Sequence, residues 1–139
     1  MSELRSEDGF PTDASVRKGQ PVVSGVLDYF PQALLAVAEL SRVGNEQHNN
    51  GELMHWARGK SMDHADTIVR HLMQRGTWDE TTWWDKLLGK VRTASVRHST
   101  KVAWRALALL QEEIEVAEGL PMSRGSRQAP VKEVTGWTK

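Results

Sequence analysis

The sequence contains no cysteine, which excludes disulfide bonds and thiolate zinc sites and suits a reducing cytoplasm. Its 18 basic and 18 acidic residues cancel, so no overall field favours DNA or an anionic membrane. No apolar run approaches the length of a membrane span, and the N-terminus MSELRSEDGF lacks the apolar core of a signal peptide. We therefore expect a soluble cytoplasmic protein whose partners include neither nucleic acid nor a membrane.

Phenylalanine and tyrosine are scarce, with two and one residues, whereas tryptophan occurs six times. An indole offers a flat face and one N–H donor, which suits base stacking or a subunit interface, although core packing is its commoner use. At 139 residues the chain is long enough for one domain with a core. Polar, aperiodic ends predict a flexible arm over residues 1–25, a domain over residues 26–119, and a tail over residues 120–139 that could act as an oligomerisation arm.

The segment SMDHADTIVRHLMQRG, from Ser61 to Gly76, predicts a helix. Ser61 is a suitable N-cap, and Gly76 is a natural stop. Helical spacing places Asp63, Asp66 and Arg70 on one face. Another face carries an apolar stripe of Met62, Ala65, Ile68, Val69, Leu72 and Met73.

The polar face of this helix allows two interpretations. In one, Asp66 and Arg70 form an ordinary i,i+4 ion pair on a solvated surface. In the other, Asp63 and Asp66, one turn apart on a rigid helix, share a hard divalent cation such as Mg²⁺ or Mn²⁺. The second interpretation requires further carboxylates from another helix.

A second helix is predicted from Pro31 to Val43, with proline at its first position and Gly44 just beyond its end. It is apolar nearly all round, which indicates a central position. Glu39 lies among apolar neighbours, so we expect its carboxylate in a dry region, where an unpaired charge is costly. Glu39 would hold a cation or pair with Arg70, and in either case it would meet the aspartate face described above.

The connection between these helices, from Asn45 to Lys60, is a polar loop. It is longer than the packing of two helices requires, and loops of that length tend to be functional. Glu46 could supply a further carboxylate to the cation, although a solvated charge is its commoner role. His48 and Trp56 could clamp a base or a ribose.

Two further helices are predicted towards the C-terminus. A short one within the segment from Thr77 to Gly89, with Asp79 or Thr81 as its N-cap, would present tryptophans to the core or to a subunit interface. A long one from about Ala94 to Glu118 would end at Gly119. The inner stripe of the long helix would consist of Val96, Ala103, Ala106, Leu107, Leu110 and Ile114.

The N-terminal half of the long helix carries a basic face. His98, Lys101 and Arg105 stand at i, i+3 and i+7, so they could present cations to a polyphosphate or form a solvated stripe. The C-terminal half is acidic. We expect solvated carboxylates at Glu112, Glu113, Glu115 and Glu118.

A set of motifs between Lys18 and Glu113 carries a family resemblance. In chain order they are Lys18-Gly19-x-Pro21, Asp28-x-x-Pro31, a helix with Glu39 closed by Gly44, His55-Trp56-x-x-Gly59, Asp66-x-x-x-Arg70-His71-Leu72, and His98 ahead of an alanine-rich helix with ALALL. Together they resemble the phage dATP/dGTP pyrophosphohydrolase family. That group is MazG-like, and its MazZ-type members act on dGTP in phages that replace adenine with 2-aminoadenine.

The resemblance implies an all-α, MazG-like helical bundle in the central domain, assembled as a homodimer or homotetramer. It also implies hydrolysis of a purine deoxynucleoside triphosphate, dGTP first and also dATP or GTP, to the monophosphate and pyrophosphate. Such an enzyme would serve phage nucleotide metabolism, for example 2-aminoadenine DNA synthesis, in the host cytoplasm.

The MazG-like pattern places Glu-x-x-Glu on one helix and Glu-x-x-Asp on the next, and the four carboxylates bind Mg²⁺ or Mn²⁺. Here Asp63-x-x-Asp66 matches the second half, with aspartate in its first place. The first half is not matched, because no acidic residue stands three positions from Glu39. The resemblance therefore implies that Glu39, Asp63 and Asp66 are catalytic metal ligands, with Glu46 as a replacement for the fourth.

The resemblance also implies a set of substrate-binding residues. Arg70, Lys101 and His98 would neutralise the β and γ phosphates, while His48 and Trp56 would set the base pocket. Lys101 and Arg105 depart from the family, which has histidine and asparagine there. The full set is His48, Trp56, Arg70, His71, His98, Lys101 and Arg105.

Two alternatives stand beside this hypothesis. An HD-type dNTP triphosphohydrolase would release triphosphate and needs an adjacent histidine–aspartate pair, for which His64-Ala65-Asp66 is the nearest match. A non-enzymatic helical interaction protein would leave the polar faces solvated and use its tryptophans to dock a partner.

Overall fold

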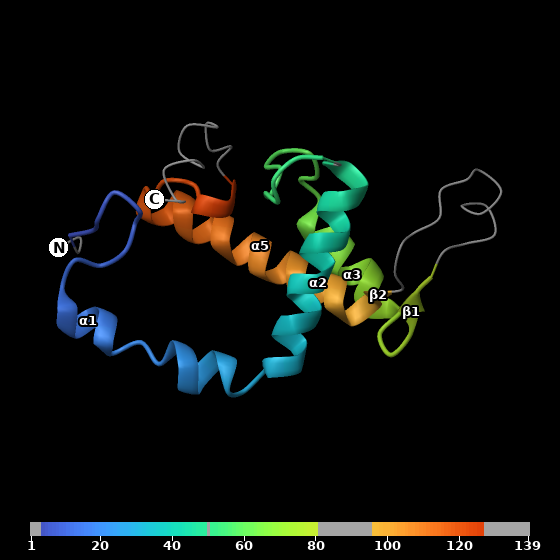
Figure 1. The fold of residues 1–139 in the computed structure, drawn as a ribbon, viewed down its shortest axis with the longest axis horizontal. Helices are drawn as coiled ribbons and strands as arrows, with labels where there is room; N and C mark the ends of the chain where they lie inside the picture. Colours follow the sequence, from blue (N-terminus) through green and yellow to red (C-terminus); the bar gives the residue numbers. More distant parts are fainter. Residues whose placement is uncertain (1–3, 50, 81–95, 127–139) are drawn as a thin grey trace.

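Three long helices are the main elements of the structure (Figure 1). The computed structural model describes residues 4–49, 51–80 and 96–126. Its main helices are α2 (Pro31–His48), α3 (His64–Met73) and α5 (His98–Glu118). Helix α5 is the longest, and α3 packs against it more extensively than α2 does. The prediction of a mostly helical fold is confirmed.

The remaining elements are short. They are the helix α1 (Ala14–Lys18), the π-helical turn η1 (Val23–Leu27), the 3₁₀ turn η2 (Arg124–Ser126) and the strands β1 (Trp78–Asp79) and β2 (Val96–Arg97). The two strands pair antiparallel, with Asp79 opposite Val96. The pairing holds Trp78 and Asp79 extended, which does not conflict with the predicted N-cap at Asp79 or Thr81, since an N-cap residue lies outside the helix.

Some predicted features lie outside the described residues. Most of the short helix predicted up to Gly89 does, together with Trp83 and Trp84. The same holds for the tail beyond residue 126, which contains Trp137.

The N-terminal arm returns to the C-terminal end of α5 (Figure 1). Arg5 Nη2 lies 2.5 Å from Glu118 Oε2, and a short β-bridge joins Arg5 to Pro11. Gly9, with a φ of 85°, packs against the Leu120 side chain. These contacts join two parts of the chain that are far apart in the sequence.

Helix α2 begins as predicted but runs further than predicted. Pro31 occupies its first turn. The prediction that Gly44 ends the helix is wrong, since the helix continues to His48. A glycine inside a helix costs roughly 0.5–1 kcal/mol. Here an ion pair between Arg42 and Glu46 spans the glycine and favours continuation of the helix.

Helix α3 begins later than predicted. Asp63, rather than Ser61, occupies the N-cap position, and the Ser61 hydroxyl donates to Asp63 Oδ1 over 2.8 Å. The helix ends at Met73, and Gly76 lies in the turn beyond it with a φ of 84°. The Asp63 carboxylate therefore lies at the start of the helix instead of inside its first turn.

Helix α5 ends as predicted but starts later. Gly119 has a left-handed φ of 63°, and the Leu120 N–H donates to the Glu115 carbonyl over 2.8 Å. The helix begins at His98 rather than near Ala94, because the two residues before His98 form β2.

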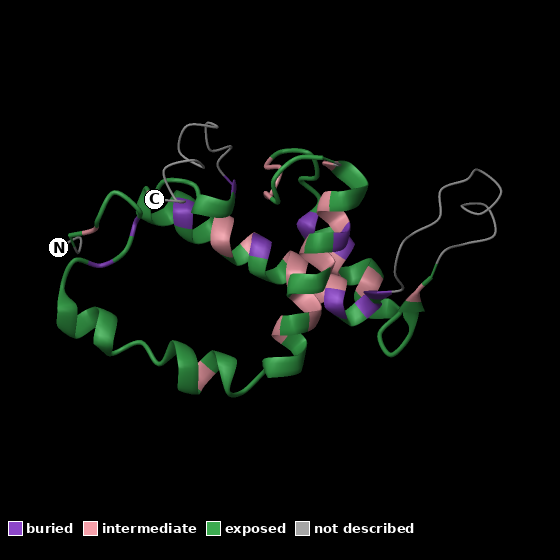
Figure 2. Ribbon diagram, viewed as in Figure 1, coloured by how far each residue is buried: buried purple, intermediate pink, exposed green. Residues whose placement is uncertain are grey.

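Most of the buried residues of the three main helices are polar, and Figure 2 shows where buried residues lie along the ribbon. The buried polar residues of α3 and α5 are His64, Thr67, His98, Thr100 and Glu115. The buried hydrophobic residues in the described part of the chain are Val43, Val96 and Ala108. The predicted inner stripes are therefore wrong for most of their members. The exposed ones include Met62, Val69, Leu72, Met73, Leu107, Leu110 and Ile114.

Helix α2 is anchored along one side only, so the prediction that it is central is wrong. Val43 is buried, and Trp104 Nε1 of α5 donates to Ser41 Oγ over 2.9 Å. Leu35, by contrast, is 70% exposed. No single helix among the described residues is long and apolar enough to cross a membrane. The segments 14–27 and 31–48, which meet at a sharp bend, together have the length and apolar composition of a span.

Candidate functional site

A cavity of about 780 Å³ lies between the three main helices and the loop that joins α2 to α3. Its volume is typical of a small-molecule binding site. The C-terminal half of α2 and the N-terminal half of α5 form its walls, together with α3. Its charged, imidazole and indole side chains are His48, His55, Trp56, Lys60, His64, His71, Asp79, Lys101, Trp104 and Arg105.

Most of the predicted substrate-binding residues meet in this cavity. Arg70 does not line it, and its exposed side chain donates to Thr67 Oγ1 over 2.9 Å. His98 is buried beside the cavity, in contact with His71. The predicted residues that do line the cavity are His48, Trp56, His71, Lys101 and Arg105.

Two indole rings form an aromatic wall. Trp56 and Trp104 meet edge to face, with ring centroids 5.5 Å apart. The Arg58 guanidinium lies 3.7 Å from the Trp56 ring centroid. The backbone amide of Trp56 donates to the Gly125 carbonyl over 2.8 Å. Trp56 is thus held in place by the chain beyond α5 as well as by its own loop.

The charged groups of the cavity are predominantly cationic. Lys60, Lys101 and Arg105 line it, and Asp79 is the one carboxylate among the described lining residues. Lys101 forms an ion pair with Asp79. Arg105 Nη1 lies 3.2 Å from His64 Nδ1. The excess of positive charge favours an anionic ligand.

His71, which lines the cavity, meets the buried His98 through a ring nitrogen, and the two rings are tilted by 33°. His71 Nδ1 is 2.8 Å from His98 Nδ1, and their ring centroids are 5.1 Å apart. Burial lowers the pKa of His71 below its ordinary value, and the nearby charges of Lys101 and His98 lower it further. His71 therefore favours the neutral form, in which one ring nitrogen is an acceptor.

Glu39 and Glu46 do not enter this cavity. Both bind Arg42 on the outer surface of α2, where Arg42 Nε lies 2.9 Å from Glu39 Oε2 and Nη1 lies 2.6 Å from Glu46 Oε1. The Glu39 side chain is 51% exposed, and its hydrogen bonds from Arg42 lower its pKa. The prediction of a dry environment for Glu39 is wrong, because the residue three positions away supplies its counter-charge at the surface.

Asp63 and Asp66 are not among the residues that line the cavity, although Asp63 contacts two residues that do, since its Oδ2 accepts from Thr67 and its Oδ1 lies 4.0 Å from Arg105 Nη1. Hydrogen bonds from Ser61 and Thr67 are the main reason that the pKa of Asp63 falls to about 2. Arg70 contacts Asp63 over 3.5 Å, so the predicted Asp66–Arg70 pair is replaced by a contact one turn further back. Asp66 is exposed.

The carboxylates that the family resemblance implied as ligands do not fit one ion within a single chain. Each of three already binds a cationic or hydroxyl group: Glu39, Glu46 and Asp63. In the described part of the chain, the four acidic residues do not form a cluster with ligand atoms close enough to share a cation.

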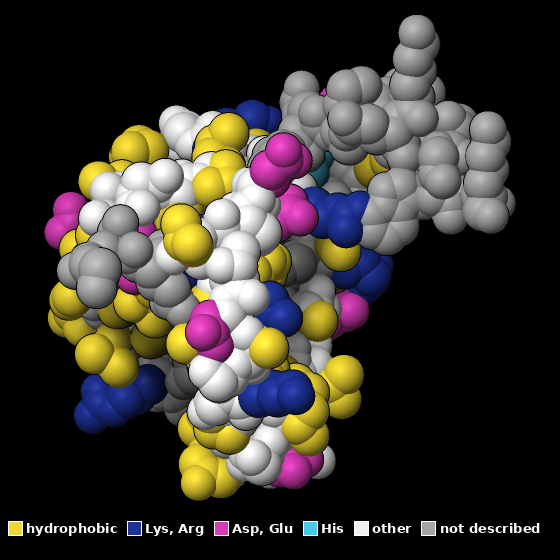
Figure 3. Space-filling view, turned by 90° about the vertical axis from the view of Figure 1, so that its left-hand side faces the viewer, with side chains coloured by type: hydrophobic (Ala, Val, Ile, Leu, Met, Phe, Trp, Pro, Cys, Tyr) yellow, Lys and Arg dark blue, Asp and Glu magenta, His cyan; other side chains and the backbone are white. Residues whose placement is uncertain are grey.

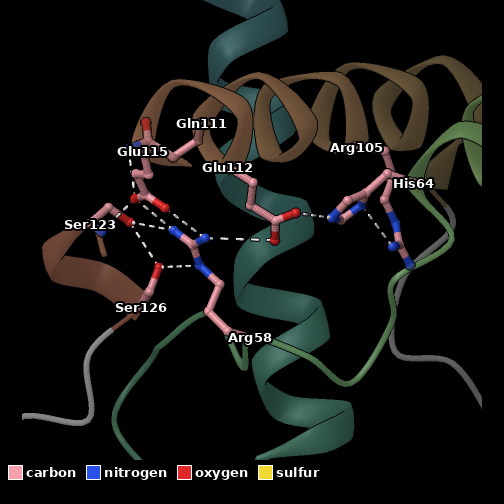
Figure 4. Close-up of polar contacts among 8 residues, drawn as sticks. All are labelled: Arg58, His64, Arg105, Gln111, Glu112, Glu115, Ser123 and Ser126. Atoms are coloured by element: carbon pink, nitrogen blue, oxygen red, sulfur yellow. Dashed lines mark hydrogen bonds and ion pairs between the residues drawn. The ribbon is translucent and has the colours of Figure 1, made fainter. Parts of the chain in front are cut away.

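A buried ionic network joins the loop before α3 to α5 and to the chain beyond α5 (Figure 4). The spacing of its residues in the sequence gives no sign of it. Arg58, from the loop, donates to both carboxylate oxygens of Glu115 over 2.9 Å each. Its Nε donates to Ser126 Oγ over 2.8 Å. The prediction that Glu115 is solvated is wrong, since the residue is 7% exposed.

The electrostatics of Glu115 are those of a fully bonded buried carboxylate. Burial raises its pKa, but hydrogen bonds from Arg58, Gln111 and the Ser123 amide outweigh burial and bring the pKa below its ordinary value. Glu115 therefore stays ionised and holds the loop and the chain beyond α5 together.

A second branch of the network runs through His64. Its Nε2 lies 3.2 Å from Glu112 Oε2, an ion-pair distance without hydrogen-bond alignment (Figure 4). Because Arg105 can only donate, His64 Nδ1 accepts, and the ring hydrogen is on the Nε2 side that faces Glu112. The prediction of a solvated Glu112 is wrong. His64 is buried whereas Asp66 is exposed, so these two do not form a histidine–aspartate pair.

Comparisons of the chain with protein-family models, with curated proteins and with solved structures found no match.

Proposed function

We propose that the cavity binds a purine nucleoside triphosphate, with dGTP the preferred substrate and dATP or GTP further ones. The protein hydrolyses the bond between the α and β phosphates and releases the monophosphate and pyrophosphate. The observation that carries the proposal is the meeting of an indole wall with lysine, arginine and imidazole groups in one cavity.

The aromatic wall supports a base-binding role. A purine presents a flat face, and stacking on an aromatic side chain contributes about 1–3 kcal/mol per base. Trp56 and Trp104 line the cavity, and their edge-to-face packing fixes both rings. His48, at the end of α2, lines the same cavity and offers ring nitrogens to a base edge or a ribose hydroxyl.

The cationic groups support a polyphosphate-binding role. Arg105 presents a planar guanidinium that suits phosphate oxygens, and Lys101 presents a compact point charge. Both charges would neutralise the leaving pyrophosphate, whose charge grows as the bond to the α-phosphorus breaks. The resemblance implies Mg²⁺ or Mn²⁺ as a cofactor, but its carboxylate set does not fit one ion in a single chain, so the role assigned here to Lys101 and Arg105 does not depend on a metal.

The test is a chromatographic assay of both products. Purified protein is incubated with dGTP, dATP, dCTP, dTTP and GTP, in Mg²⁺, in Mn²⁺ and with a chelator. The expected result is monophosphate and pyrophosphate from a purine substrate, and loss of turnover with chelator would identify a metal-dependent enzyme. Release of triphosphate would instead indicate the HD-type reaction. No turnover of any nucleotide would contradict the proposal and favour an interaction protein.

We also propose that the protein is a homodimer or homotetramer. Hydrophobic side chains are exposed on all three main helices, and Figure 3 shows such side chains spread over one face of the molecule. Three small or medium hydrophobic residues are buried in the described part of the chain, which is little for a domain of this length. Permanent homo-oligomers bury apolar interfaces of this kind, and the zero net charge leaves a second copy unrepelled.

Replacing Leu110 by glutamate is expected to dissociate the assembly. Leu110 is 52% exposed on α5, so the change leaves the protomer fold intact but places a charge in an apolar interface. Sedimentation velocity should give a multiple of the chain mass for the wild type and the single-chain mass for Leu110→Glu. Val116→Glu is the matched control, since Val116 is exposed on a different face of α5. A monomeric wild type would contradict the prediction.

A further inference from the structure

We propose that His71, Asp79 and His98 form a binding site for a first-row transition-metal cation such as Zn²⁺. Each side chain offers one ligand atom, and these atoms all lie within 4.8 Å of one another. Of the histidines and acidic residues in the described ranges, these three make up the group with metal-ligand spacing. The site is separate from the carboxylates that the family resemblance implied, and it does not require nucleotide turnover.

The backbone brings the three ligands together from three elements. His71 lies in the last turn of α3, Asp79 ends β1, and His98 is the first residue of α5. The pairing of β1 with β2 fixes Asp79 against Val96, two residues before His98. The His98 amide donates to the Thr77 carbonyl over 3.1 Å. The cluster is therefore held by strand pairing and helix packing rather than by its own side chains.

The imidazole geometry suits a shared cation. The two Nδ1 atoms are 2.8 Å apart, so at most one hydrogen can lie between them. A cation in place of that hydrogen would accept the lone pairs of both rings. Zinc–nitrogen bonds of about 2.0–2.1 Å in tetrahedral geometry separate two nitrogen ligands by roughly 3.3 Å. The rings need to open by only about half an ångström, which a small rotation of the side chains provides.

The surroundings of the imidazoles also favour metal ligation. His98 is 5% exposed, and the His71 side chain is half-buried. Lys101 pairs with Asp79 and so holds the carboxylate beside the two imidazoles.

The ligand set selects the class of metal. Two imidazoles and one carboxylate suit zinc, cobalt or nickel, whereas magnesium and calcium prefer oxygen ligands alone. Three protein ligands leave a fourth position open. His71 and Asp79 both line the cavity, so the open position faces it, where water or an anionic ligand can bind.

The first test uses the full chain after chelator treatment and without nucleotide. Titration calorimetry with Zn²⁺ should show about one ion per chain, bound at least roughly 100-fold more tightly than Mg²⁺. Titration with Co²⁺ should produce visible absorption typical of a low-coordinate site with nitrogen ligands. The absence of both zinc binding and cobalt absorption would overturn the proposal, whatever the outcome of the nucleotide assay.

The second test assigns the ligands. His98→Ala and Asp79→Asn should each weaken zinc binding roughly tenfold or more. His55→Ala is the matched control, because it removes another partly buried imidazole outside the cluster. Circular dichroism checks that each variant is folded, and the nearly isosteric Asp79→Asn remains informative if His98→Ala does not fold. An equal loss in His55→Ala, or no loss in the folded ligand variants, would contradict the assignment.

Discussion

Replacing Arg58 by alanine is expected to lower the free energy of unfolding by about 3–5 kcal/mol, because it leaves a buried carboxylate without its counter-charge. Arg58 donates to both oxygens of Glu115, and Glu115 is 7% exposed. The same guanidinium binds Ser126 and stacks on Trp56, so the change also loosens the cavity wall. Chemical denaturation followed by circular dichroism measures the loss, and the melting temperature should fall by about 10 °C or more.

Two companion variants separate the ion pair from a general effect of losing arginine. Arg75→Ala removes an exposed arginine whose side chain donates a hydrogen bond to the Leu72 carbonyl, and its effect should stay within about 0.5 kcal/mol. The double variant Arg58→Met with Glu115→Leu replaces the buried pair by apolar side chains and should recover most of the stability. A small effect of Arg58→Ala alone would contradict the prediction.

The pH dependence of unfolding provides a further check on this pair. The pKa of Glu115 is lower in the folded protein than its ordinary value, so its ionised form stabilises the fold above the ordinary pKa of a glutamate. That contribution is lost as the pH falls through the lowered pKa. The wild type should therefore lose stability on the acid side more steeply than the Arg58→Met, Glu115→Leu double variant, which lacks this titrating group.

Replacing Lys101 by methionine is expected to lower kcat/KM for the preferred purine triphosphate by about 100-fold or more. Methionine keeps the length of the side chain but removes the charge that would stabilise the leaving pyrophosphate. Lys101 lines the cavity next to Asp79, so the ammonium is held in position before substrate binds. The product assay described above measures the change, and circular dichroism confirms that the helices remain.

Two further variants decide what the effect of Lys101 means. Lys101→Arg keeps the charge and should retain part of the activity. Arg75→Met removes a cation that does not line the cavity, and its kcat/KM should match the wild type. An unchanged kcat/KM in Lys101→Met, or an equal loss in Arg75→Met, would remove Lys101 from the substrate site.

The local features of the fold were predictable from the sequence. Pro31 begins α2 and Gly119 ends α5, as predicted. Both effects depend on only a few neighbouring backbone atoms, so the local sequence is enough to predict them. The end of α2 was not predictable from Gly44 alone. There the side chains on either side of the glycine, Arg42 and Glu46, form an ion pair that a rule about one residue does not include.

The site was predictable in its cations and aromatic groups but not in its acids. Lys101, Arg105 and Trp56 were singled out by residue type and helical spacing, and the cavity collects them. Arg58 and Glu115, which form the buried ion pair, are 57 residues apart in the chain. Such a pair leaves no periodic pattern, because both residues are charged and each alone resembles a solvated surface group.

The inward polar faces of the helices have a calorimetric consequence. The heat capacity change of unfolding grows with the apolar surface exposed and is reduced by the polar surface exposed. A protomer that buries Val43, Val96 and Ala108 together with histidines, threonines and a glutamate would therefore unfold with a small heat capacity change and a flat stability curve. If the heat capacity change is instead close to the ordinary one for a chain of this length, additional apolar surface must be buried between subunits. The melting temperature would then rise with protein concentration.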